Sequence, residues 1–155
     1  MKKYVWYTFY SLLIILSLFI GYKIIKRIYN CNVVRTYKMQ REGDIYIGKM
    51  DFRGRMIGEG TYIFAEGDRY EGEFSENQFS GKGTYYFASG DVYEGDFQNS
   101  DFNGFGKYTD VEGYVYEGEY KDNERHGYGR YYLRDSLILE GMWKDGEFVS
   151  TETII

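Results

Sequence analysis

Residues 70–74 read YEGEF, and the same pattern returns as YEGDF at residues 93–97 and as YEGEY at residues 116–120. A related unit begins at Tyr46, and a partial one, LEGMW, begins at Leu139. Successive units therefore start 24, 23, 23 and 23 residues apart. A fixed period of this length is typical of repeat architectures, in which each repeat is one supersecondary unit that buries its apolar side against its neighbours.

Each unit contains a second motif, a pair of glycines with one residue between them, followed two residues later by a tyrosine. The glycine pairs are Gly58/Gly60, Gly81/Gly83, Gly104/Gly106 and Gly127/Gly129, and the tyrosines that follow them are Tyr62, Tyr85, Tyr108 and Tyr131. Both motifs lie in segments whose residue types alternate with a period of two, as in β-strands. Each unit is therefore predicted to form a β-hairpin, and consecutive hairpins are predicted to form one antiparallel meander.

The connections follow from the polar residues between these segments. The stretch at residues 75–82 is suited to the hairpin connection inside a unit, and Ala88–Asp91 is suited to the turn into the next unit. Three departures from the repeat are expected to leave the fold intact. They are an extra residue within residues 51–57, Asp110 in the place of a phenylalanine, and Ser136 in the place of a glycine.

The two faces of the predicted sheet differ in their chemistry. On one face aromatic residues alternate with glycines, so a ring can lie over the bare backbone of a neighbouring glycine, an arrangement that rescues strand glycines. On the other face acidic strands alternate with strands that carry a basic residue, and opposite charges across strands contribute roughly 0.2–1 kcal/mol per pair. The residues of this charged face are Glu71, Glu73, Glu94, Asp96, Glu117 and Glu119, with Lys82, Lys107 and Arg130. We interpret the acids as solvated ladder residues.

The combination of Y-x-G-x-F with a following G-x-G resembles the MORN (membrane occupation and recognition nexus) repeat over residues 44–148. The resemblance implies a mostly β fold, an elongated single-layer antiparallel sheet of stacked β-hairpins with aromatic residues on its inner surface. It also implies a scaffold or binding module rather than an enzyme, of a kind often found in membrane-associated proteins and in some cases dimeric. The partial unit with Trp143 is expected to be a cap, and residues 147–155 are expected to close the sheet edge.

The N-terminal part of the chain is of a different kind. Residues 4–22 form an uncharged run of 19 residues, and a helix that crosses a hydrocarbon core of about 30 Å needs roughly 20 residues. We predict a transmembrane anchor at residues 1–28, a basic linker at 29–43 and the repeat sheet at 44–155. A cleaved signal peptide fits less well, because no small-residue cleavage site follows the run. A buried soluble helix is the third alternative.

The charge of the chain changes at the same boundary. Residues 1–42 carry a net charge of +7, and residues 43–155 carry one of −12. The excess of basic residues after the apolar run predicts a single-pass protein whose repeat domain lies in the cytoplasm. Lys23, Lys26 and Arg27 are the candidate contacts with anionic lipid headgroups. A sheet of net −12 is repelled by an anionic surface, which argues against the alternative in which the repeats themselves bind acidic phospholipids.

The composition excludes most kinds of chemistry. The chain has one histidine, His126, and one cysteine, Cys31, so it can form neither an internal disulfide nor a zinc site built from several such residues. The glycine pairs lack the spacing of phosphate-binding loops, and the acidic repeat region lacks the basic face that nucleic-acid binding requires. We predict no enzyme activity, cofactor, metal, nucleic acid or small-molecule substrate. Cys31 is interpreted as a free thiol or, alternatively, a palmitoylation site.

The function that these exclusions leave is binding. A single-layer sheet has nothing to cover its aromatic face, and exposed apolar area of that kind marks interaction surfaces. The candidate partner-binding residues are Tyr70, Phe74, Tyr85, Tyr93, Phe97, Tyr108, Tyr116, Tyr120 and Tyr131. The expected partner is another protein or a second copy of the chain; alternatively, the rings only fill the sheet's own core. A second hypothesis is an exported envelope protein whose tyrosine-rich surface binds a glycan or wall component.

Overall fold

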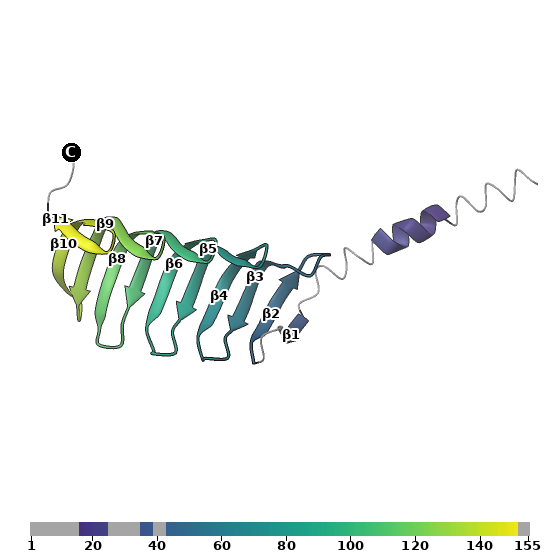
Figure 1. The fold of residues 1–155 in the computed structure, drawn as a ribbon, viewed down its shortest axis with the longest axis horizontal. Coiled ribbons are helices and arrows are strands. Elements are labelled where there is room, and N and C mark those ends of the chain that lie inside the picture. Colours follow the sequence, from purple (N-terminus) through teal and green to yellow (C-terminus); the bar gives the residue numbers. More distant parts are fainter. Residues whose placement is uncertain (1–15, 25–34, 39–42, 152–155) are drawn as a thin grey trace, which may run out of the picture.

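A computed structural model of the chain describes residues 16–24, 35–38 and 43–151. Over these residues eleven strands form one open antiparallel sheet, in which each strand lies beside the strands that precede and follow it in the sequence (Figure 1). The strands are β1 (Arg35–Lys38), β2 (Ile45–Met50), β3 (Met56–Ile63), β4 (Arg69–Ser75), β5 (Gln78–Tyr86), β6 (Val92–Gln98), β7 (Asp101–Thr109), β8 (Tyr114–Lys121), β9 (Glu124–Leu133), β10 (Ser136–Lys144) and β11 (Glu147–Ser150). The predicted single antiparallel meander is confirmed.

The hairpin connections inside the units are shorter than predicted. Between β4 and β5 only Glu76 and Asn77 lie outside the strands, and both have positive φ angles, 52° and 73°. Two central residues with positive φ form the turn whose twist matches that of the flanking strands. The prediction of a connection at residues 75–82 was wrong because the polar residues after Asn77 belong to β5, which begins at Gln78.

The pairing inside each hairpin is interrupted by a β-bulge at the glycine pair. Between β4 and β5 the register shifts after Gly72, and Gly81 adopts a φ of 61° that other residues rarely reach. The carboxylate of Glu73 accepts a hydrogen bond from the backbone nitrogen of Lys82 at 3.2 Å. The corresponding bonds in the next two hairpins are Phe105 N to Asp96 Oδ2 at 3.0 Å and Tyr128 N to Glu119 Oε1 at 3.1 Å. These three acids therefore stabilise the bulges by accepting backbone hydrogen bonds. The sequence analysis had interpreted them only as solvated residues in cross-strand charge pairs.

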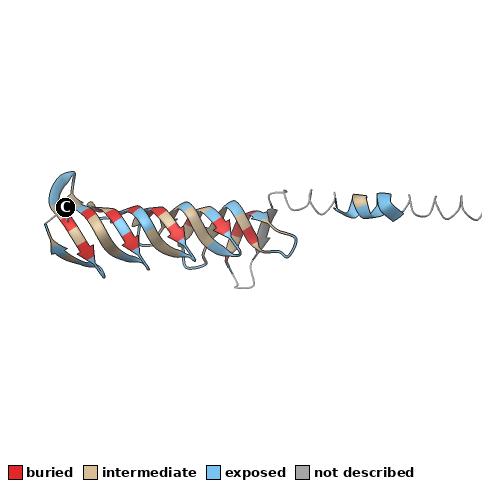
Figure 2. Ribbon diagram, turned by 90° about the horizontal axis from the view of Figure 1, so that it is seen from above, coloured by how far each residue is buried: buried red, intermediate tan, exposed pale blue. Residues whose placement is uncertain are grey.

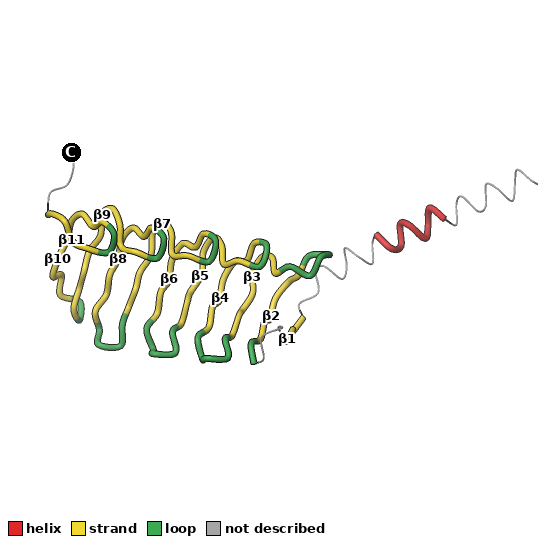
Figure 3. Tube along the Cα trace, viewed as in Figure 1, coloured by secondary structure: helices red, strands yellow, loops and turns green. Residues whose placement is uncertain are grey.

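The turns between units agree with the prediction, and they explain two departures from the repeat. Phe87 and Asp91 close one turn, with Phe87 N donating to Asp91 O at 2.9 Å. In the next turn the Asp110 carboxylate accepts hydrogen bonds from two backbone nitrogens, at 2.9 Å each, so the turn keeps its form without a phenylalanine. Ser136 needs no positive φ, because only Arg134 and Asp135 lie between β9 and β10 and Ser136 begins β10. Figure 3 shows the turns that connect the strands along the sheet.

The core of the sheet is a line of tyrosines, each at most 1% exposed: Tyr46, Tyr70, Tyr93 and Tyr116. The ring of Tyr93 stacks on Phe102 with centroids 3.7 Å apart, and its hydroxyl donates to the carbonyl oxygen of Asp96 at 3.0 Å. A Cβ added to Gly106 would lie 2.6 Å from Cε2 of the same ring. The prediction of rings over bare glycine backbone is confirmed, and the buried residues recur from unit to unit along the sheet (Figure 2).

The sequence analysis predicted the edge strand at the C-terminal end of the sheet but not the one at the N-terminal end. At the N-terminal end, β1 comes from the segment expected to be a basic linker and pairs with β2, with Arg35 opposite Gly48. At the C-terminal end, β11 pairs with β10 as an edge strand, as expected for a cap. Residues 152–155, predicted to continue this edge, lie outside the described residues.

The predicted transmembrane anchor lies mostly outside the described residues. Of residues 1–28 the structure describes only 16–24, which are helical. Within the described part of the chain, no helix has the length and apolar character needed to span a bilayer.

Because tyrosine rings pack directly on glycine backbone, a methyl group added at one of these glycines should strongly destabilise the sheet. Gly106→Ala would force a Cβ against the Tyr93 ring, and overpacking of this kind costs about 1–3 kcal/mol. We expect the free energy of unfolding in urea to fall by that amount. Lys107→Ala, on the next residue and the opposite face, is the matched control and should change it by less than about 1 kcal/mol, the usual worth of an exposed ion pair. Equal effects of the two substitutions would contradict the packing described here.

Candidate functional site

The rings predicted to bind a partner fall into two groups in the structure. We call the side of the sheet that carries the core tyrosines the inner face and the other side the outer face. Six of the predicted rings are buried, namely Tyr70, Phe74, Tyr93, Phe97, Tyr116 and Tyr120. Three are half-buried, namely Tyr85, Tyr108 and Tyr131. The six buried rings belong to the sheet's own core, and partner binding by any of the nine residues stays a prediction.

Several half-buried rings of the inner face form a row across the strands, in which neighbouring rings are in contact from Tyr62 to Tyr108. Tyr85 contacts Phe64 and Phe87 with ring centroids 5.9 and 4.7 Å apart, and Phe87 contacts Tyr108 at 5.8 Å. We call this set the ring row; its members are Tyr62, Phe64, Tyr85, Phe87, Tyr108 and Tyr131. No described strand packs over the ring row, because all described strands belong to one sheet.

Three aspartates that the sequence analysis missed hold the tyrosines of the ring row in place. The hydroxyl of Tyr85 donates to Asp68 Oδ2 at 2.6 Å, and that of Tyr108 donates to Asp91 Oδ2 at 2.8 Å. The same geometry joins Tyr62 to Asp44 at 2.9 Å. The other oxygen of each aspartate accepts a backbone N–H from the following turn.

A recurring sequence signal could have identified these aspartates. Each follows the turn glycine and precedes a core tyrosine by two residues, in the pattern G-D-x-Y at residues 43–46, 67–70 and 90–93. At residues 113–116 the pattern becomes G-Y-x-Y, so Tyr114 stands where the aspartate would be. Its ring instead stacks on Tyr131, with centroids 5.7 Å apart.

Three tyrosine hydroxyls of the inner face, those of Tyr85, Tyr108 and Tyr116, have raised pKa values that favour their neutral form. Burial raises the pKa of Tyr108 to about 12, and the hydrogen bond to Asp91 raises it in the same direction. Burial also raises the pKa of Tyr116 to about 12, although the positive charge of Arg125 works against that shift. The pKa of Tyr85 is raised mainly by burial and further by Asp68. The hydroxyls therefore act as hydrogen-bond donors throughout the physiological pH range.

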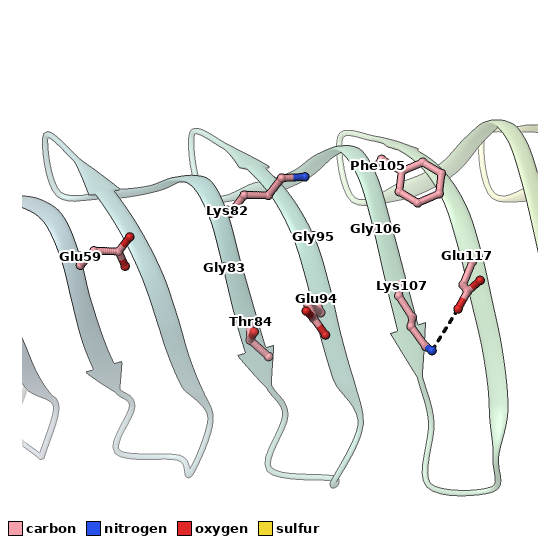
Figure 4. A pocket seen from close by; sticks show the side chains of 10 residues that line it. All are labelled: Glu59, Lys82, Gly83, Thr84, Glu94, Gly95, Phe105, Gly106, Lys107 and Glu117. Atoms are coloured by element: carbon pink, nitrogen blue, oxygen red, sulfur yellow. Dashed lines mark ion pairs between the residues drawn. The ribbon is translucent and has the colours of Figure 1, made fainter.

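The outer face carries an open hollow of about 740 Å³ between β3 and β8 (Figure 4). Lys82 and Lys107 line it, and each forms an ion pair with the neighbouring acidic strand, as the alternation of charges predicted. Lys82 Nζ lies 2.7 Å from Asp96 Oδ1, and Lys107 Nζ lies 3.0 Å from Glu117 Oε1. The ring of Phe105 also borders the hollow and is 59% exposed. The third predicted base, Arg130, pairs with Glu140 at 2.8 Å. Around the hollow the outer face therefore carries cross-strand ion pairs, further acids such as Glu59 and Glu94, and the exposed ring of Phe105.

The remaining residues that the sequence analysis singled out are His126, Cys31 and the basic residues after the apolar run. His126 Nδ1 lies 3.8 Å from Asp145 Oδ1. Among the described residues no group of three metal-ligating side chains could hold a metal ion. Lys23 lies over the ring of Phe19, 4.6 Å from its centroid. Lys26, Arg27 and Cys31 lie outside the described residues.

A comparison with protein families agrees with the geometry of the repeat. The MORN repeat model matches residues 52–69, 70–92, 93–113 and 116–137, more than half of the chain. The chain belongs to the MORN repeat family. Three of the matched repeats begin at the core tyrosines Tyr70, Tyr93 and Tyr116, one or two residues after the starts of β4, β6 and β8. Each of these repeats therefore comprises one strand pair with its bulge. A comparison with curated proteins gave no match. MORN membership supports a repeat-based module for protein interaction or membrane binding.

The raised pKa values predict a loss of stability at high pH. Tyr108 and Tyr116 titrate near pH 12 when folded and near pH 10 when unfolded, so folding favours their neutral form. Their contribution to stability is complete below pH 10 and is lost as the pH rises toward 12. We expect the urea midpoint, followed by circular dichroism, to fall across this window together with a late rise in phenolate absorbance. Complete ionisation of all tyrosines near pH 10 with the sheet intact would contradict this assignment.

Proposed function

We propose that this MORN repeat chain is a non-enzymatic interaction module that binds a protein segment along the ring row and is tethered to a membrane by its N-terminal segment. The observation that carries the proposal is the ring row itself. It is a line of half-buried aromatic rings on the one layer of the sheet, and no described strand covers it. Contiguous exposed apolar surface of this kind is typical of interaction sites.

The ring row has the dimensions and rigidity of a docking surface. It runs from β3 to β9, and seven strands about 4.8 Å apart span about 30 Å. A segment of about nine extended residues has that length, at about 3.3 Å per residue. The aspartates that bond the tyrosine hydroxyls fix the rings before a partner arrives, which lowers the entropy cost of binding. Tyrosine also offers a large amphipathic contact surface.

The membrane part of the proposal rests on the sequence. The apolar run of residues 4–22 has the length of one bilayer crossing. The basic residues that follow it, Lys23, Lys26 and Arg27, would contact anionic headgroups. The acidic sheet would be repelled by the same surface, so the tether would hold it away from the bilayer on the cytoplasmic side.

One observation favours a second candidate, the exported protein that binds a glycan. The exposed ring of Phe105 lies beside the hollow of the outer face, with Thr84 and Glu94 among the polar groups that line it (Figure 4). An aromatic ring beside polar groups can stack on a sugar and bond its hydroxyls. This candidate places binding on the outer face, which separates it from the first.

Two sets of substitutions distinguish the faces. The first set is the double variant Phe64→Asp and Phe87→Asp. Asp110 occupies the same repeat position in the next unit, so the turns should accept aspartate at both positions. We expect this double variant to lower the recovery of protein partners in proximity labelling by at least about tenfold, because it puts charges into the ring row; tenfold in affinity corresponds to about 1.4 kcal/mol.

The matched control for the outer face is Phe105→Lys, which copies Lys82 of the preceding unit. Partner recovery should not change in this variant. If Phe105→Lys loses the partners while the double variant keeps them, the outer face is the binding surface and the ring-row proposal fails.

The tether is tested by removing residues 1–28, which leaves β1 and the edge of the sheet in place. We expect the truncated protein to stay in the supernatant when mixed with anionic liposomes, whereas the full chain sediments with them. Retention of the truncated protein on the liposomes would show that the sheet itself binds the lipid. Protease added to intact cells should leave the repeats of the full chain uncut, and cleavage would support the exported alternative.

A further inference from the structure

The aromatic core changes its chemistry toward the C-terminal end of the sheet. At the fifth position of the repeat, the units that begin at Tyr70 and Tyr93 carry Phe74 and Phe97. The next two units carry Tyr120 and Trp143 at that position. Phe79 and Phe102 each stack on the core tyrosine of their unit. The next unit carries Arg125 at the same repeat position. The earlier side chains carry no hydrogen-bond donor, whereas Tyr120, Arg125 and Trp143 each carry at least one. Three polar donors have therefore replaced phenylalanines of the core.

These three donors lie around one ring. The Tyr116 ring centroid is 5.2 Å from that of Tyr120 and 5.1 Å from that of Trp143. The guanidinium carbon of Arg125 is 5.2 Å from the Tyr116 centroid and 5.2 Å from the Trp143 centroid. It is also 5.1 Å from the centroid of Tyr131, the last member of the ring row. The cluster therefore adjoins the end of the ring row.

The donors of this cluster have no acceptor in the described part of the chain. The indole nitrogen of Trp143, a residue only 6% exposed, is buried without a hydrogen-bond partner. Among the described residues no carboxylate forms an ion pair with Arg125, and no group accepts a hydrogen bond from the Tyr120 hydroxyl. The repeat position that supplies Asp68 and Asp91 in earlier units is occupied here by Tyr114. A buried donor is normally paired, so the Trp143 indole nitrogen, with the half-buried Arg125 and the Tyr120 hydroxyl in the same cluster, indicates a missing acceptor.

We infer that Arg125, Tyr120 and Trp143 form a subsite for one carboxylate, supplied by an aspartate or glutamate side chain of the protein segment that binds the ring row. The inference rests on the proposed function and adds the chemistry of the partner. The guanidinium offers paired N–H groups whose geometry matches a carboxylate. The surrounding rings order the arginine side chain before the ligand binds. This lowers the conformational entropy that the side chain loses on binding.

The charge of the sheet limits the ligand to an isolated carboxylate. Residues 43–155 carry a net charge of −12, so a polyanion or an anionic lipid surface would meet repulsion from the rest of the sheet. A single acidic residue within an apolar segment satisfies the three donors and brings little further repulsion. The subsite therefore selects one acidic residue at the end of the bound segment.

The test follows the indole N–H signal of Trp143 in the full chain, uniformly labelled with nitrogen-15 in detergent micelles. Trp6→Phe removes the other indole signal and assigns the one that remains. The probes are N-acetylglutamate amide, its uncharged analogue N-acetylglutamine amide, and inorganic phosphate. We expect a saturable shift with the glutamate compound alone. Arg125→Phe, which restores the residue type of Phe79 and Phe102 and so should fold, should abolish the shift, and Arg125→Lys should weaken binding by at least about tenfold.

The other outcomes overturn the inference. An equal shift with the glutamine compound, or a shift that survives Arg125→Phe, would show that the site does not recognise the charge. A stronger response to phosphate would assign the site to phosphate rather than carboxylate. If Arg125→Phe keeps every partner that the Phe64→Asp and Phe87→Asp variant loses, the carboxylate subsite plays no part in partner binding, while the proposed function of the ring row stands.

Discussion

Tyrosine rings that lie over glycine backbone are the interaction on which this sheet depends. A single layer has no second layer to bury its apolar side, so the sheet must bury rings against its own backbone. Tyr93 fills the space that a side chain at Gly95 or Gly106 would occupy, and it stacks on Phe102 at the same time. Burial of the hydroxyl end is balanced by a hydrogen bond to a backbone carbonyl. The same unit, repeated along the chain, gives a continuous core.

Two further constraints turn this packing into a regular array. The bulge at each glycine pair re-aims the strand, and an acid from the neighbouring strand, such as Asp96, binds the freed backbone nitrogen. At the other end of the strands, aspartates such as Asp68, at the end of one unit, bind both a tyrosine and the turn of the next unit. Polar groups thus fix the geometry between units, whereas the rings supply the burial.

This division limits where the proposed partner could bind. Tyr46, Tyr70, Tyr93 and Tyr116 are buried in the core, so the proposed binding surface consists of the half-buried ring row and the cluster around Arg125 at its end. The cation at Arg125 lies where the repeat has phenylalanine in earlier units, next to the last ring of that row. The C-terminal end of the sheet therefore differs from its middle in side-chain polarity, although the backbone pattern is the same.

The sequence by itself determined the repeat, the antiparallel meander and the alternation of faces, because a 23-residue period and a two-residue period are both visible in a linear chain. It also placed the strands of Lys82 and Lys107 beside acidic strands, where the structure shows their ion pairs. Only the tertiary structure decided which rings are accessible. Tyr70 and Tyr85 are the same residue type on the same face, yet one is buried under its neighbours and the other is half-exposed. Accessibility depends on how strands from different units pack, and so does the convergence of Tyr120, Arg125 and Trp143 around one ring. No local pattern records either of them.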